Sequence, residues 1–279
     1  MVLVGLTSRE EAVWEAIEQW EEEYFIEGDK NTIYSLETSL NKAIEKWRPD
    51  LQERLFNTID SLIFHSHAIS QNSKYDKETT AKVLDFGRVF NSDINEIADM
   101  KYLTIDQLRF ITNQQLAKQR LLSLAQGGFS GIGGLLTISL DLPLMLTINL
   151  RSIQLTAMTY GYDLYKPYEL MLALKVFHVA TLPKTMQKEG WKQLVMELNH
   201  IEDEWLMFDE KDSYKSTVWL QQPVKQIGKG MVLFLLRNKL IKGIPLLGIT
   251  VGAAANYFLA KQVTEITHQF YQKRYLLEK

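Results

Sequence analysis

Residues 127–153, GGFSGIGGLLTISLDLPLMLTINLRSI, hold five glycines, one proline, one acid and one base in an otherwise uncharged and largely apolar stretch. A stretch of this kind suits three structures: a phosphate-binding loop, a membrane segment, or the centre of a helical core. The segments that flank it distinguish the first structure from the other two, and they indicate the fold class of the whole chain.

The glycines do not have the surroundings of a phosphate-binding loop. Such a loop joins a β-strand to a helix, and the Walker form ends in Gly-Lys-Ser or Gly-Lys-Thr. Here the preceding residues 114–125, QQLAKQRLLSLA, are helical in character, and Gly134 is followed by two leucines. The spacing of Gly127 and Gly131 is instead typical of helices whose backbones approach closely. We therefore expect no nucleotide and no other cofactor.

Two runs without charge, 121–140 and 243–260, suit either buried core helices or membrane segments. The first run has the length that a helix needs to cross the hydrocarbon core of a bilayer. It also contains glycines, serines and threonines, and Asp141 at its end is costly in lipid unless it is paired or close to the interface. Pro143 and Pro245 mark helix starts or kinks. The sequence leaves burial and membrane entry open.

Apolar residues at alternating spacings of three and four predict an all-α fold: a multi-helix bundle with the two glycine-rich apolar runs as helical hairpin segments in its core. Serine or threonine followed three residues later by Glu or Gln predicts capping boxes at Ser8 and Thr104, and Pro167 suits a first helical turn. No segment alternates with the period of a β-strand. The stripes are Val13, Ile17, Trp20 and Tyr24; residues 33–47; residues 55–69; Val83, Phe86, Phe90, Ile94 and Ile97; residues 191–205; and Asn256, Leu259, Val263, Ile266 and Phe270.

Composition predicts a folded protein of 279 residues with a sizeable core. The chain has no cysteine, which excludes disulfides, thiolate metal sites and cysteine nucleophiles, and which suits a cytoplasmic protein. The first residues lack the basic region of a secretory signal. We expect an N-terminal helical region with an acidic first helix at 1–100 and a glycine-rich helical core with a basic C-terminal segment at 101–279, joined as one continuous domain. The expected location is cytoplasmic, peripheral to or partly inserted in the cytoplasmic membrane.

Charge is unevenly distributed along the chain. Residues 1–30 carry a net charge of −7 and residues 211–279 a net charge of +8. The two ends can attract each other, or the basic end can face anionic lipid. Five bases interleaved with apolar residues have the composition of a membrane-surface element: Lys225, Lys229, Arg237, Lys239 and Lys242. The expected partners are membrane lipid or a membrane transporter. Nucleic acid is not expected, because no recognition motif accompanies the charge, and the sequence names no small-molecule ligand.

The candidate site consists of polar and glycine residues at the borders of the two apolar runs. Asp141 either accepts hydrogen bonds from the free amides of a helix that begins at Pro143, or pairs with Arg151. A straight helix does not align two residues ten positions apart, so the pair needs a kink or a neighbouring helix. The whole set is Asp141, Pro143, Asn149, Arg151, Gly131, Gly248, Gly252 and Asn256.

The sequence supplies no catalytic residue and no metal ligand set. His200 and Glu204 have helical i,i+4 spacing, but HIEDE differs from the HExxH zinc motif. His178, within LKVFHVA, is interpreted as a hydrogen-bonded core histidine. No serine lies in a G-x-S-x-G elbow, so a hydrolase triad has no starting point.

Several of these residues fall in strings that resemble signatures of the EcsC protein family. The central strings are the glycine pairs, Asp141-Leu-Pro143, Leu150-Arg151-Ser-Ile153 and Tyr160-Gly-Tyr-Asp163. The later strings are Ile244-Pro245-Leu-Leu-Gly248, Gly252-Ala253, Asn256 and the aromatic tail from Phe270 to Tyr275. The resemblance implies a bacterial setting associated with a membrane or an ABC transporter, and it does not supply a catalytic residue.

Three hypotheses for function follow. The first is a non-enzymatic accessory or regulatory protein at the membrane surface, linked to a bacterial ABC transporter. The second is a hydrolase acting on lipid or peptide, with Asp141, Arg151 and histidines in one cleft. The third is a soluble helical module that holds an acyl chain in an apolar interior.

Overall fold

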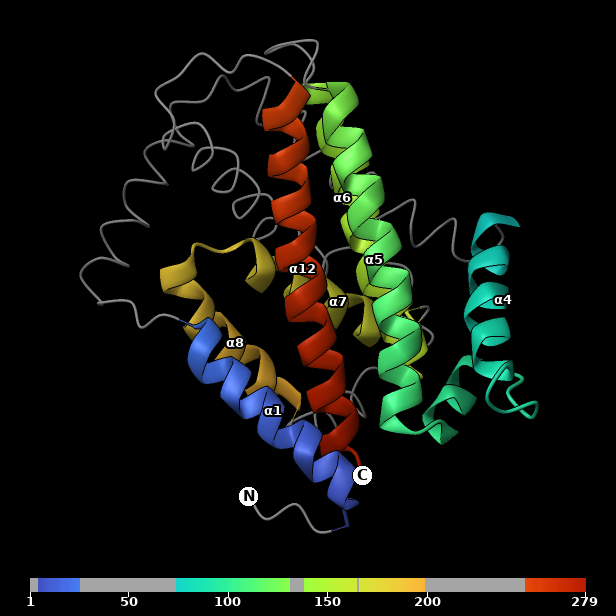
Figure 1. Cartoon of the computed structure of the whole chain (residues 1–279). Coiled ribbons are helices and arrows are strands. Elements are labelled where there is room, and N and C mark those ends of the chain that lie inside the picture. The colour runs from blue at the N-terminus through green and yellow to red at the C-terminus, as the bar shows by residue number, and fades with distance from the viewer. Residues whose placement is uncertain (1–4, 26–73, 131–137, 165, 199–248) are drawn as a thin grey trace.

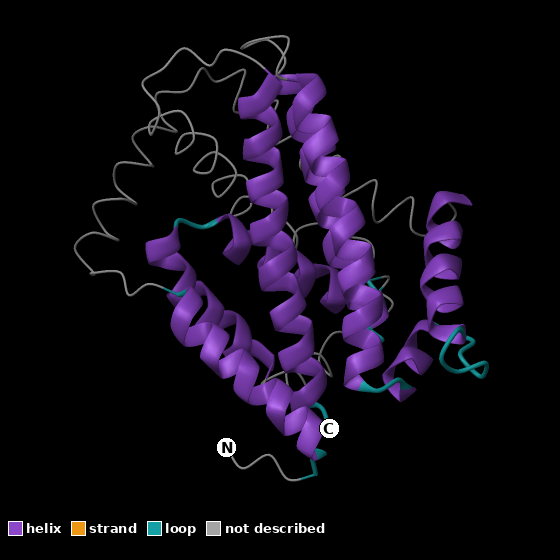
Figure 2. Ribbon diagram, viewed as in Figure 1, coloured by secondary structure: helices purple, strands orange, loops and turns teal. Residues whose placement is uncertain are grey.

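The computed structural model describes residues 5–25, 74–130, 138–164, 166–198 and 249–279. Within these ranges the regular structure is helical and no β-strand occurs, which confirms the all-α prediction (Figures 1 and 2). The predicted stripes at 33–47 and 55–69 lie outside the described residues. The elements are α1 (Ser8–Tyr24), α4 (Lys74–Arg88), the 3-10 helix η1 (Ile97–Tyr102), α5 (Ile105–Ser130), α6 (Ile138–Thr159), α7 (Pro167–Thr181), α8 (Lys184–Leu198) and α12 (Ile249–Leu277).

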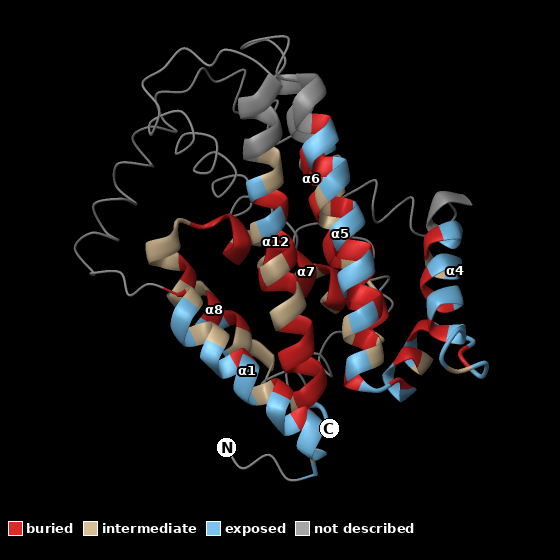
Figure 3. Ribbon diagram, in the orientation of Figure 1, coloured by how far each residue is buried: buried red, intermediate tan, exposed pale blue. Residues whose placement is uncertain are grey.

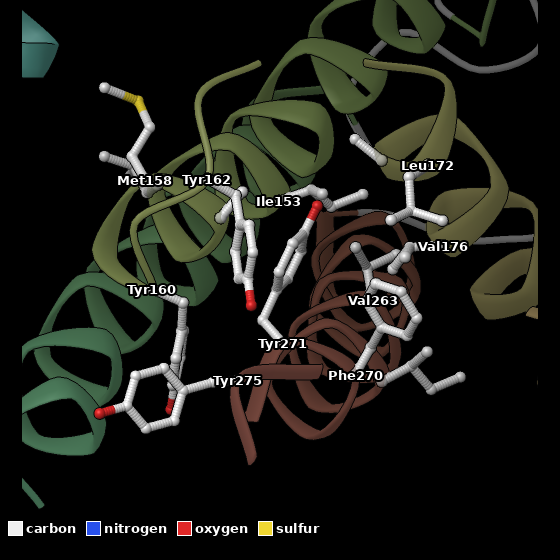
Figure 4. Packing of buried hydrophobic residues seen from close by; sticks show 14 of the residues in the cluster. Ile153, Met158, Tyr160, Tyr162, Leu172, Val176, Val263, Phe270, Tyr271 and Tyr275 are labelled. Carbon is white, nitrogen blue, oxygen red and sulfur yellow. The ribbon is translucent and has the colours of Figure 1, made fainter. Parts of the chain in front are cut away.

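Helix α12 lies at the centre of the bundle and packs against α5, α6, α7 and α1 (Figure 1). The stripe predicted for it is confirmed at Leu259, Val263, Ile266 and Phe270, which are fully buried, whereas Asn256 is half-buried. Figure 3 shows buried residues along the faces that α12 shares with its neighbours. Side chains from α6, α7 and α12 meet in one cluster (Figure 4). The position of α12 therefore determines where the surrounding helices lie.

Helix α1 begins with a capping box one residue earlier than the sequence predicts. The Glu10 amide donates to Thr7 Oγ1 at 3.3 Å, and the Thr7 amide donates to the Glu10 carboxylate at 2.9 Å. The N-cap is therefore Thr7 and not Ser8, because Thr7 is the residue with extended backbone geometry before the first turn. The predicted stripe is confirmed where Val13 and Ile17 are buried.

Acidic side chains of α1 pair with lysines from the other end of the described chain. Glu10 lies 2.5 Å from Lys279, and Glu21 lies 2.5 Å from Lys273. Burial by itself would raise the pKa of Glu10, but the hydrogen bonds from Lys279 and Thr7 outweigh it and hold the pKa below its usual value. For these residues, the acidic and basic ends of the sequence attract each other inside the protein.

The single helix expected over residues 83–97 is wrong. Helix α4 ends at Arg88, and Arg88 Nε donates to the carbonyl oxygen of Ile94 at 2.9 Å, which holds the chain in a turn before η1. Val83 and Ile94 are both fully buried, but from two separate segments, while Phe86 and Phe90 are each 39% exposed. Apolar spacing alone does not distinguish one long helix from two segments that bury residues in the same core.

Two other local predictions are confirmed. Thr104 and Gln107 form the capping box before α5, with the Thr104 amide 2.9 Å from Gln107 Oε1 and the Gln107 amide 3.4 Å from Thr104 Oγ1. Helix α7 begins at Pro167. The fixed φ angle and the missing amide hydrogen of proline suit the first turn of a helix. Helix α8 covers the first part of the stripe at 191–205, and Trp191 and Leu194 are buried.

Helix α6 ends in a Schellman motif at Gly161. The Tyr162 amide donates to the carbonyl oxygen of Ala157 at 2.9 Å, and the Gly161 amide donates to that of Met158 at 3.0 Å. Gly161 has a φ of 86°, a conformation that residues with a Cβ atom rarely adopt. A Cβ atom there would also lie 2.5 Å from Lys101 Cγ. The turn that leads from α6 to α7 therefore requires glycine.

We predict that Gly161→Ala lowers the free energy of unfolding by about 1–2 kcal/mol, because alanine is strained in the left-handed conformation. The measurement is the urea denaturation midpoint. Gly190→Ala is the matched control: Gly190 lies inside α8, where the new methyl group meets the flexible side chain of Leu182 at 3.0 Å. Equal midpoints for the two variants would contradict the role assigned to Gly161.

Candidate functional site

Between Gln119 and Gln126, α5 turns amide and hydroxyl side chains inward and leucines outward. Gln119, Ser123 and Gln126 have exposed fractions of 8%, 1% and 8%. Leu121, Leu122 and Leu124 have exposed fractions of 63%, 46% and 40%. A surface helix of a globular protein shows the opposite arrangement, with its apolar stripe toward the core. This reversal is the most unusual feature of the described residues.

Helix α6 also buries polar residues and satisfies most of them within its own turns. The hydroxyls of Ser152, Thr156 and Thr159 each lie 2.8–2.9 Å from the carbonyl oxygen four residues earlier. Asn149 Nδ2 donates to the carbonyl oxygen of Met145 at 2.7 Å. Back-bonding of this kind allows a helix to carry polar side chains in surroundings that offer few other partners.

Polar contacts fix the register of α5 against α6 and α12. Arg120 Nε donates to Thr264 Oγ1 at 2.6 Å, and Thr159 Oγ1 lies 3.1 Å from Gln115 Oε1. Helix α5 is antiparallel to both partners, so the end of α5, the start of α6 and the start of α12 lie together, at the top of Figure 1. Among these residues Leu144 is 51% exposed and Phe258 is 63% exposed.

We call this part of the bundle the apolar end. It is defined by the exposed side chains beyond the Arg120–Thr264 hydrogen bond. Its members are Leu121, Leu122, Leu124, Leu144 and Phe258.

At the opposite end of α12, a buried arginine binds a buried glutamate. Arg274 Nη1 and Nη2 lie 2.6 and 2.8 Å from the two carboxylate oxygens of Glu169, and the side chains are 5% and 9% exposed. The guanidinium carbon of Arg274 also lies 3.7 Å from the ring centroid of Tyr162. A paired, two-point contact of this geometry is what a charge needs to remain ionised inside a protein.

Glu278 and Lys101 extend this pair to the surface. Arg274 Nε lies 2.8 Å from Glu278, and Lys101 Nζ lies 2.7 Å from the other oxygen of that carboxylate. Burial alone would raise the pKa of Glu278, but the charges of Arg274 and Lys101 outweigh it and keep the pKa below its usual value. For Arg274, the hydrogen bonds with Glu169 similarly outweigh burial and raise the pKa. The cluster joins α7, α12 and η1 through these ion pairs.

His268 lies between the two ends of α12, in a half-buried position beside Tyr160. His268 Nε2 lies 3.2 Å from the Tyr160 hydroxyl. Burial, together with the charges of Arg109 and Arg120, lowers the pKa of His268 to about 3. Burial also raises the pKa of Tyr160 well above its usual value. Both groups are neutral at physiological pH, so the contact is a hydrogen bond between uncharged groups.

The predicted site residues do not converge in the described part of the chain. The backbone of α6 runs through Asp141 and Pro143, and α12 includes Gly252, but the side chains of Asp141 and Pro143 lie outside the described residues. Arg151 donates to Gln154 Oε1 at 3.1 Å and to Thr79 Oγ1. Gly131, Gly248 and the bases Lys225, Lys229, Arg237, Lys239 and Lys242 also lie outside the described residues.

The expected helix start at Pro143 is wrong, because α6 begins five residues earlier at Ile138. Pro143 is therefore inside the helix, and Asp141 is not an N-cap residue of a helix that begins there. A pair between Asp141 and Arg151 stays a prediction.

Sequence reasoning missed the Arg274–Glu169 pair, the His268–Tyr160 contact and the reversal of α5. The first two join residues more than one hundred positions apart, so no local sequence pattern indicates them. The reversal had a signal: Gln115, Gln119, Ser123 and Gln126 recur at helical spacing, so one face of α5 is polar whichever way it points.

No helix in the described part of the chain is long and apolar enough to cross a membrane. In the same residues, no three acidic or histidine side chains gather in a group that could hold a metal ion. His200 and Glu204, the pair with helical i,i+4 spacing, lie outside the described residues.

Comparison with known proteins gives a family and two relatives. The model of the EcsC protein family matches residues 11–276. The chain is 28% identical over 154 residues to Uncharacterized protein YdbA of Bacillus subtilis, which covers 55% of this chain and 53% of YdbA. It is 24% identical over 203 residues to Protein EcsC of the same organism, which covers 72% of this chain and 78% of EcsC. The chain thus spans about half the length of YdbA. No solved structure matches.

We predict that Glu169→Gln lowers the free energy of unfolding by about 3–5 kcal/mol, because it leaves the charge of Arg274 buried without its main partner. The double variant Glu169→Gln/Arg274→Met should lose less of the free energy of unfolding than the single variant, since it removes the uncompensated charge. Denaturant midpoints measure both. Arg9→Met, which breaks the exposed pair with Asp106, is the control and should change the midpoint little. A double variant less stable than Glu169→Gln would refute this account.

We predict that the free energy of unfolding decreases as the pH is lowered, over a range that is set by His268. Its folded pKa, about 3, is below its ordinary value of 6.5, so the unfolded chain binds a proton first as the pH drops. The stabilising contribution is complete above about pH 6.5 and declines toward pH 3, by at most about 1.4 kcal/mol per pH unit. His268→Gln should reduce the slope of unfolding free energy between pH 6.5 and 4.5. An unchanged slope in this variant would assign the effect to other groups.

Proposed function

Since the chain belongs to the EcsC protein family, we propose that it is a bacterial membrane-surface protein whose apolar end enters one leaflet of the cytoplasmic membrane. Its role there is non-enzymatic, as an accessory or regulator of an ABC transporter, the setting that the family resemblance implies. The observation that carries the proposal is the reversal of α5, which buries Gln119, Ser123 and Gln126 and exposes leucines.

The energetics of the apolar end suit reversible attachment. A leucine or phenylalanine side chain gains about 1.5–3 kcal/mol when it moves fully from water to an apolar environment. The five side chains of the apolar end are 40–63% exposed, so each has about half of that gain still available. The sum is several kcal/mol, from which the cost of association is subtracted. Attachment of this strength depends on further contacts and can be released.

The length of the apolar end suits half a bilayer. Residues 121–130 of α5 rise about 14 Å along the helix axis. One leaflet contributes about 15 Å of hydrocarbon. A surface protein that reaches this depth needs no spanning helix. Asp141 limits the depth, because a carboxylate at the centre of a bilayer costs about 2.5–3.5 kcal/mol on insertion scales.

The other two hypotheses have less support. An acyl-chain carrier needs apolar walls inside, whereas the inward residues of α5 from Gln119 to Gln126 are polar. A hydrolase built on Asp141 and a histidine needs the two in one cleft. The continuous helix α6 places Asp141 about 27 Å along its axis from Thr159, next to the Tyr160–His268 contact. Asp141 and His268 are therefore too distant to act on one bond.

We predict that Leu121→Gln/Leu122→Gln/Phe258→Gln weakens binding to neutral phosphatidylcholine vesicles about a hundredfold, through the loss of about 1 kcal/mol at each side chain. Co-sedimentation with vesicles measures the effect. The fold should be preserved, because the three side chains are already exposed.

Met196→Gln is the matched control, since Met196 is 59% exposed on α8, away from the apolar end. It should leave vesicle binding unchanged. Wild-type protein that does not bind vesicles would overturn the proposal. A triple variant that binds as well as the wild type would overturn it too, and this face would then be covered by protein.

A further inference from the structure

The apolar end has an exposed lysine at its base on each of two helices. Lys118 precedes Leu121 by three residues on α5, and Lys261 follows Phe258 by three residues on α12. Residues three apart lie on the same face of a helix. Because α5 and α12 are antiparallel, both lysines lie on the same side of their apolar neighbours, toward the start of α5 and the end of α12.

The register places the two lysines on opposite sides of the Arg120–Thr264 level. Arg120 and Thr264 are joined by a hydrogen bond of 2.6 Å. Lys118 lies two residues from Arg120, and Lys261 lies three residues from Thr264 in the opposite direction along the bundle. At 1.5 Å per residue, their Cα atoms are about 7.5 Å apart along the axis. This separation is similar to the thickness of the headgroup layer of one leaflet, about 5–7 Å, and lysine side chains are long enough to reach that layer.

The charges of these lysines are not neutralised by the described part of the protein. Neither Lys118 nor Lys261 has an ion pair there, and both are exposed. The nearest acid of α12, Glu265, accepts a hydrogen bond from Trp20 Nε1 at 3.1 Å. Arg120, which is half-buried between them, donates to the Thr264 hydroxyl. Beyond the Arg120–Thr264 level, the charged residues of α5, α6 and α12 are Lys261, Arg151 and Asp141.

We infer that Lys118 and Lys261 form a cationic collar that binds the phosphate groups of anionic phospholipids when the apolar end enters the membrane. The inference rests on the proposed function and adds a lipid class and a limit on depth. Leu124, Leu144 and Phe258 enter the hydrocarbon. The ammonium groups of the collar remain at the phosphate layer, because they are stabilised there and not below it, and Lys261 extends its long side chain back to that layer.

The test compares Lys118→Gln/Lys261→Gln with the wild type on two kinds of vesicle. On vesicles that contain phosphatidylglycerol, a loss of about fivefold for each lysine predicts binding about twentyfold to thirtyfold weaker in the double variant. On pure phosphatidylcholine vesicles, binding should not change. High salt should reduce the difference between the two proteins. Lys118→Arg/Lys261→Arg should bind anionic vesicles like the wild type.

Lys192→Gln is the matched control, because Lys192 is an exposed lysine on α8. It should not change binding to either vesicle, and the bases at 225–242 are present in every variant. A double glutamine variant that binds anionic vesicles as tightly as the wild type overturns the collar. That result leaves binding to neutral vesicles, and so the proposed function, intact. Absence of wild-type binding to the phosphatidylcholine vesicles instead overturns the proposed function.

Discussion

A buried helix needs a partner inside the protein for each of its charged side chains. Helix α12 is buried on all sides from Phe270 to Leu276. Lys273 and Arg274 lie within these two turns. Lys273 binds Glu21 of α1, and Arg274 binds Glu169 of α7. Because an unpaired charge in this position is costly, the placement of α1 and α7 depends on the needs of α12 as much as on their own apolar stripes.

The apolar end of the bundle has the opposite distribution of polar and apolar side chains. There the buried side chains of α5 are amides and a hydroxyl, and the exposed ones are leucines. Such a surface is poorly suited to water but well suited to an apolar environment. The two ends of α12 therefore differ in kind: one is held by ion pairs within the protein, and the other presents apolar groups outward.

Local patterns in the sequence predicted local structure well. The stripe of α12, the capping box at Thr104 and the start of α7 at Pro167 are determined by residues a few positions apart, and each is confirmed. The 83–97 prediction was wrong because helical spacing persisted by chance across the turn after Arg88.

The candidate site was less accessible to sequence reasoning. The uncharged run at 121–140 was visible, but which face of α5 points outward depends on α6 and α12. Likewise, the partner of Arg274 lies 105 positions away. Burial and pairing of this kind are properties of the assembled bundle, and a single sequence does not show them.

The central place of α12 has a consequence for the order in which the chain folds. Its contacts with α1 join residues separated by 245 positions at Trp20–Glu265, 252 at Glu21–Lys273 and 269 at Glu10–Lys279. Contacts of such high sequence separation close large loops, which costs loop-closure entropy. Because α12 is made after the helices it joins, the surfaces of α1, α5, α6 and α7 that pack against α12 are covered only once α12 has been synthesised. Apolar surface that is uncovered during synthesis is the kind of surface that chaperones bind.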